Sequence, residues 1–124
     1  MSRTRTVLLA LLLSVVLVAR AQAEGDAGRG KTLFSRCVAC HAVTAQNKVG
    51  PGLAGVVGRQ AGTAPNFHYS KGMVDYAKVW TDQTLDNYLT APTKAVPGTK
   101  MTIAVPSASD RADIIAYLKT VGAQ

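Results

Sequence analysis

Three segments of the chain carry apolar residues at the spacing of a helix. The pattern predicts helices over about 26–37, 82–91 and 110–121. No segment alternates apolar and polar residues for long enough to predict a strand, so the remaining chain forms two long loops, about 41–80 and 92–108. Loops of this length in a small domain are typically functional or wrap a ligand. The sequence therefore predicts an all-α domain with three main helices.

The expected ends of the second and third helices have capping and stop residues. Thr81 can cap the second helix and Pro92 ends it, whereas Ser109 can cap the third and Gly122 closes it. Gly30 interrupts the apolar stripe of the first helix, where glycine costs about 1 kcal/mol relative to alanine. We therefore expect another element to approach the chain closely at Gly30.

The N-terminal segment has the three-part layout of a secretory signal peptide. A basic start precedes an apolar run over 7–19, and Ala21-Gln22-Ala23 has the small-x-small form that a signal peptidase recognises. The apolar run is shorter than the ~20 residues that span a bilayer. We predict that residues 1–23 are removed on export, which leaves 24–124 as one domain in the periplasm.

The net charge limits the classes of partner. The formal charge is +7 for the whole chain and falls to +4 without Arg3, Arg5 and Arg20 of the signal peptide. The remaining basic residues are dispersed, which favours contact with an acidic protein surface, or peripheral contact with a membrane at most. No basic stripe interleaved with aromatic residues predicts nucleic-acid binding. We expect a monomer.

The segment Cys37-Val38-Ala39-Cys40-His41 carries the most distinctive chemistry of the chain. A disulfide across so short a loop would stabilise little, and a thioredoxin-like pair needs a strand and a βαβ setting. A zinc site needs further ligands, and His68 is the other histidine. Cys-x-x-Cys-His is instead the signature of covalent haem c attachment, in which each thiol adds to one haem vinyl group and His41 becomes the proximal ligand.

The second axial ligand decides what such a haem does. An open iron position implies gas binding or peroxide chemistry, whereas a second protein ligand implies electron transfer. By ligand chemistry, Met73, Met101 and His68 are all candidates. The residues alone leave this choice open.

Residues 25–118 resemble class I cytochromes c, the mitochondrial proteins and their bacterial periplasmic relatives. The matching segments are GDAGRGKTLFSRCVACH, GPGLAGVVGR, APNFHYS, Trp80, YLTAP, PGTKM and DRADIIAYLK, in the order of the family. The resemblance implies the small cytochrome c fold, with three main helices and long loops around one covalently bound haem c. It also implies that His41 and Met101 are the two axial ligands.

The resemblance assigns roles to further residues. The carbonyl of Pro51 is expected to accept a hydrogen bond from His41, and Tyr88 to lie beside the methionine sulfur with Thr99 nearby. The residues expected to hold the haem propionates are Arg59, Tyr69 and Trp80. Apolar contacts with the haem are expected from Leu53, Leu85 and Leu89. The crossing of the first and last helices is expected to involve Gly30, Phe34 and Tyr117.

Three positions depart from the family pattern. Ile103 stands where an aromatic residue is usual near the exposed haem edge, Met73 replaces a small amide, and His68 occupies a surface loop. The loop between His41 and Pro51 is two residues shorter than in the common mitochondrial form. These departures bear on the reduction potential and on docking.

The function implied by the resemblance is that of a soluble one-electron carrier. Its partners would be redox proteins with acidic docking surfaces, such as a cytochrome bc1-type complex, a terminal oxidase, a reaction centre or a dehydrogenase. Lys48, Lys94 and Lys100 are expected around the exposed haem edge, where they would steer such a partner. The alternatives are a haem enzyme or gas sensor with an open iron site, and a dedicated electron-accepting subunit of a periplasmic dehydrogenase.

Overall fold

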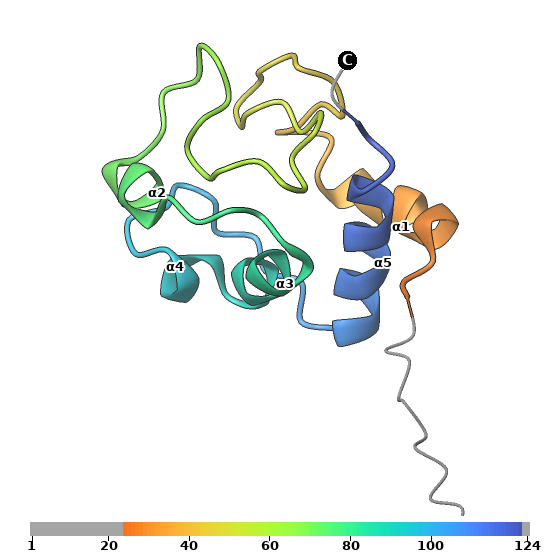
Figure 1. Ribbon diagram of the computed structural model, residues 1–124. Helices are drawn as coiled ribbons and strands as arrows, with labels where there is room; N and C mark the ends of the chain where they lie inside the picture. The colour runs from red at the N-terminus through yellow and green to blue at the C-terminus, as the bar shows by residue number, and fades with distance from the viewer. Residues whose placement is uncertain (1–23, 123–124) are drawn as a thin grey trace, which may run out of the picture.

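The computed structural model describes residues 24–122, in which the chain is helical with long connecting loops (Figure 1). The elements are α1 (Ala27–Leu33), the 3-10 turn η1 (Phe34–Arg36), α2 (Lys71–Tyr76), α3 (Asp82–Thr90), α4 (Pro92–Ala95) and α5 (Ala108–Leu118). The described residues form no strand, and Gln60 and Val79 make one isolated antiparallel bridge. The all-α prediction is therefore confirmed.

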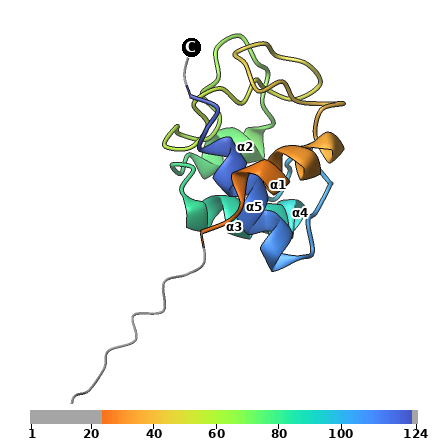
Figure 2. The ribbon, with the colours of Figure 1, turned by 90° about the vertical axis from the view of Figure 1, so that its right-hand side faces the viewer.

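The helices α1 and α5 cross in close contact, as the two views in Figures 1 and 2 show. A Cβ added at Gly30 would lie 1.9 Å from the carbonyl oxygen of Asp113 and 2.9 Å from the Cβ of Tyr117. The Phe34 ring meets the Tyr117 ring edge-on, with 5.5 Å between the ring centroids. The close approach predicted at Gly30 is confirmed, because only a residue without a Cβ lets the two backbones come this near.

The predicted bounds of the third helix lie too far toward the C-terminus. α5 begins at Ala108 and ends at Leu118, so it starts two residues before the predicted start and ends three residues before the predicted end. Its cap is Ser107, not Ser109: Ser107 has an extended backbone, and its hydroxyl accepts a hydrogen bond from the Asp110 backbone N–H at 3.2 Å. Ser109 lies in the first turn of the helix, and Gly122 lies beyond its end. The second helix is capped by Thr81 as predicted, in a reciprocal pair with Thr84.

Two short helices lie within the segments predicted as loops. Ser70 caps the start of α2, and the C-cap residue Ala77, which follows Tyr76, lies in the left-handed region with φ of 46°. Pro92 ends α3 and also occupies the first turn of α4, where its missing N–H is not needed. Helices of six and four residues are too short to produce a periodic apolar pattern, which is why the sequence did not predict them.

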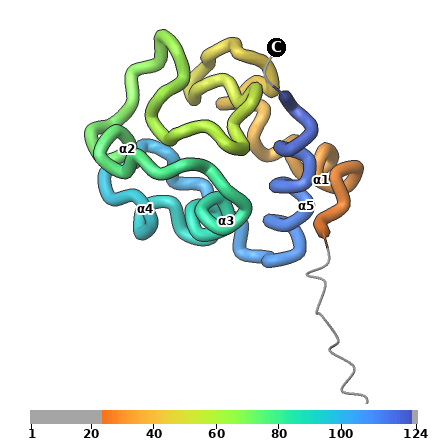
Figure 3. Tube along the Cα trace, in the orientation of Figure 1, coloured from red at the N-terminus to blue at the C-terminus, as the bar shows by residue number. Residues whose placement is uncertain are grey.

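One core joins the helices to the loops that Figure 3 traces above them. Its buried members include Phe34, Val56, Met73, Trp80, Leu85, Tyr88, Leu89, Val96, Val105, Ile114, Ile115 and Leu118. Two charged residues of α5, Arg111 and Asp113, are also buried. The apolar pattern of α5 did not predict them, because their burial depends on partners from distant parts of the chain.

Asp113 ties the start of α1 to α5. Its carboxylate accepts hydrogen bonds from the Asp26 backbone N–H at 2.7 Å and from the Arg29 guanidinium. Arg29 also donates to Asp110 at 2.7 Å. The hydrogen bond from Arg29, and then that from the Asp26 backbone, lower the pKa of the Asp113 carboxyl group. The ionised carboxylate therefore stabilises the crossing of the two helices.

Replacing Asp113 by asparagine is expected to destabilise the protein in a pH-dependent way. Because the folded state lowers the pKa of Asp113, its stabilising contribution is complete above the ordinary aspartate pKa of about 4. The contribution is lost as the pH falls through the lower folded-state pKa. Urea unfolding at pH 7 and pH 3 should show a lower unfolding free energy for Asp113→Asn at pH 7 and a smaller difference at pH 3.

The control for this measurement is Asp75→Asn. Asp75 pairs with Lys71 on the surface of α2, where both side chains are largely exposed. Such a pair contributes little to stability, so this variant should unfold as the wild type does at both pH values. A pH-independent loss in Asp113→Asn would contradict the assigned role of its charge.

Among residues 24–122 no helix is both long and apolar enough to cross a membrane. The segment predicted as a signal peptide, 1–23, lies outside the described residues.

Candidate functional site

The segment that carries both cysteines folds into one tight turn after η1. The backbone N–H groups of Cys40 and His41 both donate to the carbonyl oxygen of Cys37, at 3.1 and 2.9 Å. Cys37 and Cys40 are partly buried and do not form a disulfide with each other. The turn therefore holds two thiols and one imidazole within five consecutive residues.

The orientation of the His41 ring is fixed from two sides. Its Nδ1 lies 2.8 Å from the carbonyl oxygen of Pro51, so Nδ1 carries the proton and donates, while Nε2 is free to bind a metal. On another side, a Cβ added at Gly50 would lie only 2.4 Å from the Cε1 atom of His41. Gly50 itself is held by the hydrogen bond from its N–H to the Cys40 carbonyl oxygen, at 2.8 Å.

Burial keeps the His41 ring in the form that binds metals. It lowers the pKa of His41, the hydrogen bond to Pro51 acts in the opposite direction, and the charge of Lys48 lowers the pKa further. A neutral imidazole with one free nitrogen is the ligand form of histidine. The protonation state and the hydrogen bond of His41 thus both suit an axial haem ligand.

The residues expected at the haem propionates come from the loop that follows His41 and from the chain just before α3. The Arg59 guanidinium donates to the carbonyl oxygens of Ala54 and Gly52, both at 3.1 Å. The Tyr69 hydroxyl accepts from the Ala64 backbone N–H at 3.0 Å. Trp80 is buried, and its ring centroid lies 5.1 Å from that of Tyr88. In this structure Arg59 and Tyr69 therefore also stabilise the loop itself.

Tyr88 of α3 comes together with Thr99 and Met101 of the loop before α5. The Tyr88 and Thr99 hydroxyl oxygens lie 2.7 Å apart, and the Met101 backbone N–H donates to the Thr99 hydroxyl at 3.4 Å. Met101 is partly buried and packs against the core. Burial raises the pKa of Tyr88, which keeps its hydroxyl protonated and able to donate. The loop before α5 thus presents Met101 beside the α3 tyrosine.

The other two candidates for the second ligand have different surroundings. Met73 belongs to α2 and is part of the core cluster. His68 is exposed on the loop before α2.

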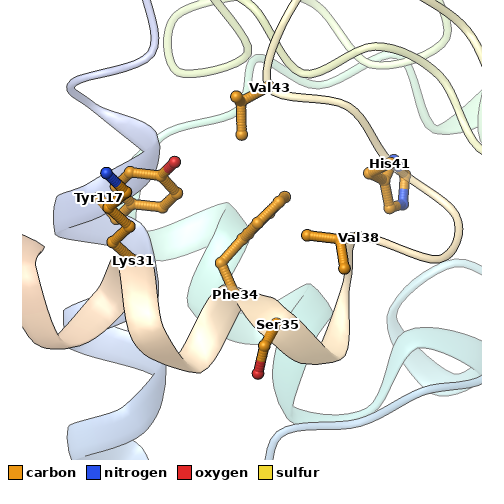
Figure 4. Close-up of a pocket in the computed structure, with 7 residues that line it drawn as sticks. All are labelled: Lys31, Phe34, Ser35, Val38, His41, Val43 and Tyr117. Carbon is orange, nitrogen blue, oxygen red and sulfur yellow. The ribbon is translucent and has the colours of Figure 1, made fainter.

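An apolar hollow of about 300 Å³ adjoins His41 (Figure 4). It is lined by Lys31, Phe34, Ser35, Val38, His41, Val43 and Tyr117. His41 lies at one end, Tyr117 and Lys31 at the other, and Phe34 projects between them. The lining includes His41 but neither cysteine nor Met101.

Sequence reasoning missed two residues that hold the loop around His41. Gly50 packs against the imidazole, and Asn47 bridges the loop: its side chain accepts from the Gly52 N–H at 3.0 Å and donates to the Pro65 carbonyl oxygen at 2.9 Å. An Asn in a Gly-rich segment is a turn signal, but the signal does not specify what the turn holds.

Comparison with known proteins identifies the class to which this fold and site belong. The family model described as "Cytochrome c" matches residues 27–122, and the chain therefore belongs to the cytochrome c family. It is 46% identical over 101 residues to cytochrome c2 of Agrobacterium tumefaciens, covering 77% of this chain and 91% of that protein.

Two further relatives extend the comparison. The chain is 46% identical over 99 residues to the cytochrome c-type cyt cy of Rhodobacter capsulatus; the match covers 78% of this chain but spans only half of that protein. The solved structure of cytochrome cH from Methylobacterium extorquens matches with a TM-score of 0.75 at 42% identity, over 77% of this chain and 99% of the other.

Family membership determines the cofactor and the general function. The cofactor is haem c, attached covalently through Cys37 and Cys40, and the two unpaired thiols on one turn beside a neutral imidazole fit that group. The chain is an electron carrier and not an enzyme. The predictions of the family, the fold, the haem and the carrier function are therefore confirmed.

Proposed function

We propose that this protein is exported to the periplasm and carries single electrons between redox complexes, with His41 and Met101 as the axial ligands of its haem. Residues 1–23 would serve as the signal peptide, with cleavage after Ala23. When bound, the haem supplies an iron that accepts and releases one electron. The protein's own residues would set the ligand geometry, the potential and the access of partners.

The hydrogen bond between His41 Nδ1 and the Pro51 carbonyl oxygen is the observation that carries this proposal. It fixes the tautomer and the orientation of the ring, and it makes Nε2 a better donor to a metal. Gly50 on another side of the ring restricts its movement. A ligand held in this way keeps the same geometry in both oxidation states, which favours fast electron transfer.

The contact between Tyr88 and Thr99 supports Met101 as the second ligand. It joins α3 to the loop that carries Met101, and the Thr99 hydroxyl also accepts from the Met101 backbone. The thioether is a soft ligand that raises the reduction potential of haem iron. His41 and Met101 together would hold the iron from the protein alone, which would exclude small molecules and leave electron transfer as the chemistry.

Replacing Met101 by alanine tests this coordination directly. The ferric wild-type protein should show a weak far-red absorption from the iron–sulfur bond, and Met101→Ala should lack it. The variant should also bind carbon monoxide when reduced. Its reduction potential should fall by on the order of 0.1 V, within the ~0.8 V range over which axial ligands set haem potentials.

The matched control is Met73→Leu, which conserves volume at the buried methionine of α2. This variant should keep the far-red absorption, because Met101 is unchanged. Loss of the absorption in Met73→Leu, or an unchanged spectrum in Met101→Ala, would contradict the assignment of Met101.

Arg59, Tyr69 and Trp80 are proposed to hold the haem propionates. A carboxylate removed from water needs hydrogen-bond donors or a cation, and these side chains supply a guanidinium, a hydroxyl and an indole N–H. The carbonyl contacts of Arg59 would place its charge at a fixed position on the loop.

The proposed partners are redox proteins with acidic docking surfaces: a cytochrome bc1-type complex, a terminal oxidase, a reaction centre or a dehydrogenase. Lys48 donates through its ammonium group to the carbonyl oxygen of Val38, between the two cysteines, and the exposed Lys100 directly precedes Met101. Lys94 is exposed on α4. Attraction by such lysines speeds association and is weakened by salt. A dedicated dehydrogenase subunit would use the same iron ligands and differ in its partner alone.

A further inference from the structure

The buried guanidinium of Arg111 connects three parts of the fold. Its Nε donates to the Asp86 carboxylate of α3 at 2.7 Å. Its Nη1 donates to the carbonyl oxygens of Val105 and Pro106, at 3.0 and 2.9 Å, in the last residues of the loop before α5. The Arg111 side chain is only 10% exposed. A single side chain of α5 therefore holds both α3 and the end of this loop.

Met101 lies between two anchors of the same loop on α3. On its N-terminal side, the Thr99 hydroxyl contacts the hydroxyl of Tyr88. On its C-terminal side, the Val105 backbone N–H donates to the Leu89 carbonyl oxygen at 2.8 Å. Arg111 binds the carbonyl oxygen of the same Val105, which is 3% exposed. The second anchor of the loop therefore depends on Arg111.

We propose that Arg111, oriented by Asp86, is a positioning residue that keeps the sulfur of Met101 within reach of the haem iron. The inference rests on the coordination by His41 and Met101 proposed above. Without the guanidinium, the carbonyl groups of Val105 and Pro106 lose their donor, and the loop gains from rearranging toward water. Rearrangement of the loop draws Met101 away from the iron.

A second ion pair joins the same two helices and provides a matched control. Lys119, the C-cap residue that follows α5, contacts Asp82 of α3 at 2.5 Å, with side chains 44% and 62% exposed. Within residues 24–122, neither side chain of this pair forms a hydrogen bond with the loop that carries Met101. Both the Arg111–Asp86 pair and the Lys119–Asp82 pair can therefore help to dock α5 on α3, but of these side chains only Arg111 donates hydrogen bonds to the loop.

Imidazole is the probe for the test, because it binds ferric haem when the methionine is displaced. The full-length holoprotein is titrated as wild type, Arg111→Gln, Asp86→Asn, Lys119→Gln and Met101→Ala, with the far-red absorption recorded. The apparent affinity for a ligand scales with the fraction of protein in the binding-competent form. Losing the donor to the buried Val105 carbonyl group and the partly buried Pro106 carbonyl group should raise that fraction about tenfold.

The expected result is imidazole binding about tenfold tighter in Arg111→Gln and by a smaller factor in Asp86→Asn, with Lys119→Gln within about twofold of wild type. Urea unfolding of each variant reports separately on global stability. If Lys119→Gln and Arg111→Gln change the imidazole affinity equally, the change results from the docking of α5 on α3, and the proposal is wrong. Unchanged imidazole affinity in Arg111→Gln would also overturn it. If Arg111→Gln does not fold, Asp86→Asn decides by the same criterion.

The Met101→Ala variant separates failure of this inference from failure of the coordination. If Met101→Ala binds imidazole more tightly than wild type and the Arg111 and Asp86 variants do not, the positioning role is wrong and the His41/Met101 coordination stands. If Met101→Ala binds imidazole as the wild type does, the coordination is wrong and the positioning role fails with it.

Discussion

Replacing Gly30 by alanine is expected to destabilise the folded protein by about 3 kcal/mol, the upper end of the usual cost of overpacking. The added methyl group would lie 1.9 Å from the Asp113 carbonyl oxygen, an atom of the α5 backbone that cannot rotate away. The helices α1 and α5 would have to separate. Their separation would also disturb the contact of the Phe34 and Tyr117 rings.

Gly28 provides the control two residues earlier in the same helix. A Cβ added at Gly28 would meet only the Asp26 carboxylate oxygen, at 3.2 Å, on an exposed part of the helix. Because alanine is the better helix former, Gly28→Ala should stabilise the protein by up to ~1 kcal/mol.

Urea unfolding of the two holoproteins, followed by circular dichroism, measures both effects. The unfolding free energy should fall in Gly30→Ala and rise in Gly28→Ala. This difference in sign distinguishes an effect on the packing of α1 against α5 from an effect on helix propensity. A Gly30→Ala variant as stable as Gly28→Ala would show that α1 and α5 do not pack at the described distance.

The three main helices could be predicted because each has a local cause in the sequence. Capping residues, a stop residue and a periodic apolar face are all read within about a dozen consecutive positions. Gly30 was informative because glycine destabilises the helix in which it lies. Its presence there therefore indicated that another part of the chain packs closely against this position. The structure provides that contact in α5.

The features that the sequence did not predict depend on contacts between distant segments. The serine that caps α5 is chosen by the backbone conformation of the preceding loop, and Ser107, not Ser109, has the extended backbone. The buried charges of Arg111 and Asp113 are satisfied by Asp86, by Arg29 and by backbone groups. No pattern within α5 contains those partners.

The candidate site divides in the same way. Cys37, Cys40 and His41 lie within five consecutive residues, so their spacing and the haem attachment that it indicates could be read directly from the sequence. Pro51, Tyr88, Thr99 and Met101 were assigned through resemblance to the family, and the structure places Pro51 against His41 and the other three together. Gly50 and Arg111 emerged from the structure alone, because each acts through a neighbour in space.

Both proposed ligands belong to irregular segments that are fixed by hydrogen bonds. His41 is held through Pro51, and Met101 lies between the contacts that Thr99 and Val105 make with α3. Loops usually move more than the elements they connect. Here the anchoring of both loops would restrict that movement at the iron, as an electron carrier with constant coordination requires.

Replacing Gly50 by alanine should therefore disturb the proximal side of the haem without removing a ligand. The added methyl group would lie 2.4 Å from the His41 Cε1 atom and within 3 Å of both ring nitrogens. The Gly50 backbone is fixed by hydrogen bonds with Cys40 and Lys48, both at 2.8 Å, and the ring is fixed by Pro51. Because neither side yields easily, we expect a loss of about 1–3 kcal/mol in stability.

Thermal unfolding and paramagnetic NMR of the His41 ring protons measure the two consequences of Gly50→Ala. The ring signals should shift and the reduction potential should change, while the haem stays covalently attached and the far-red absorption assigned to Met101 is retained. Gly122→Ala is the control, because a Cβ added at Gly122 has no neighbour within 4 Å. Native stability together with unchanged His41 signals in Gly50→Ala would contradict the packing of the ring against Gly50. A change in the His41 signals without loss of the far-red absorption would show that the two proposed axial ligands are positioned independently, His41 by its own loop and Met101 by the contacts of its loop with α3.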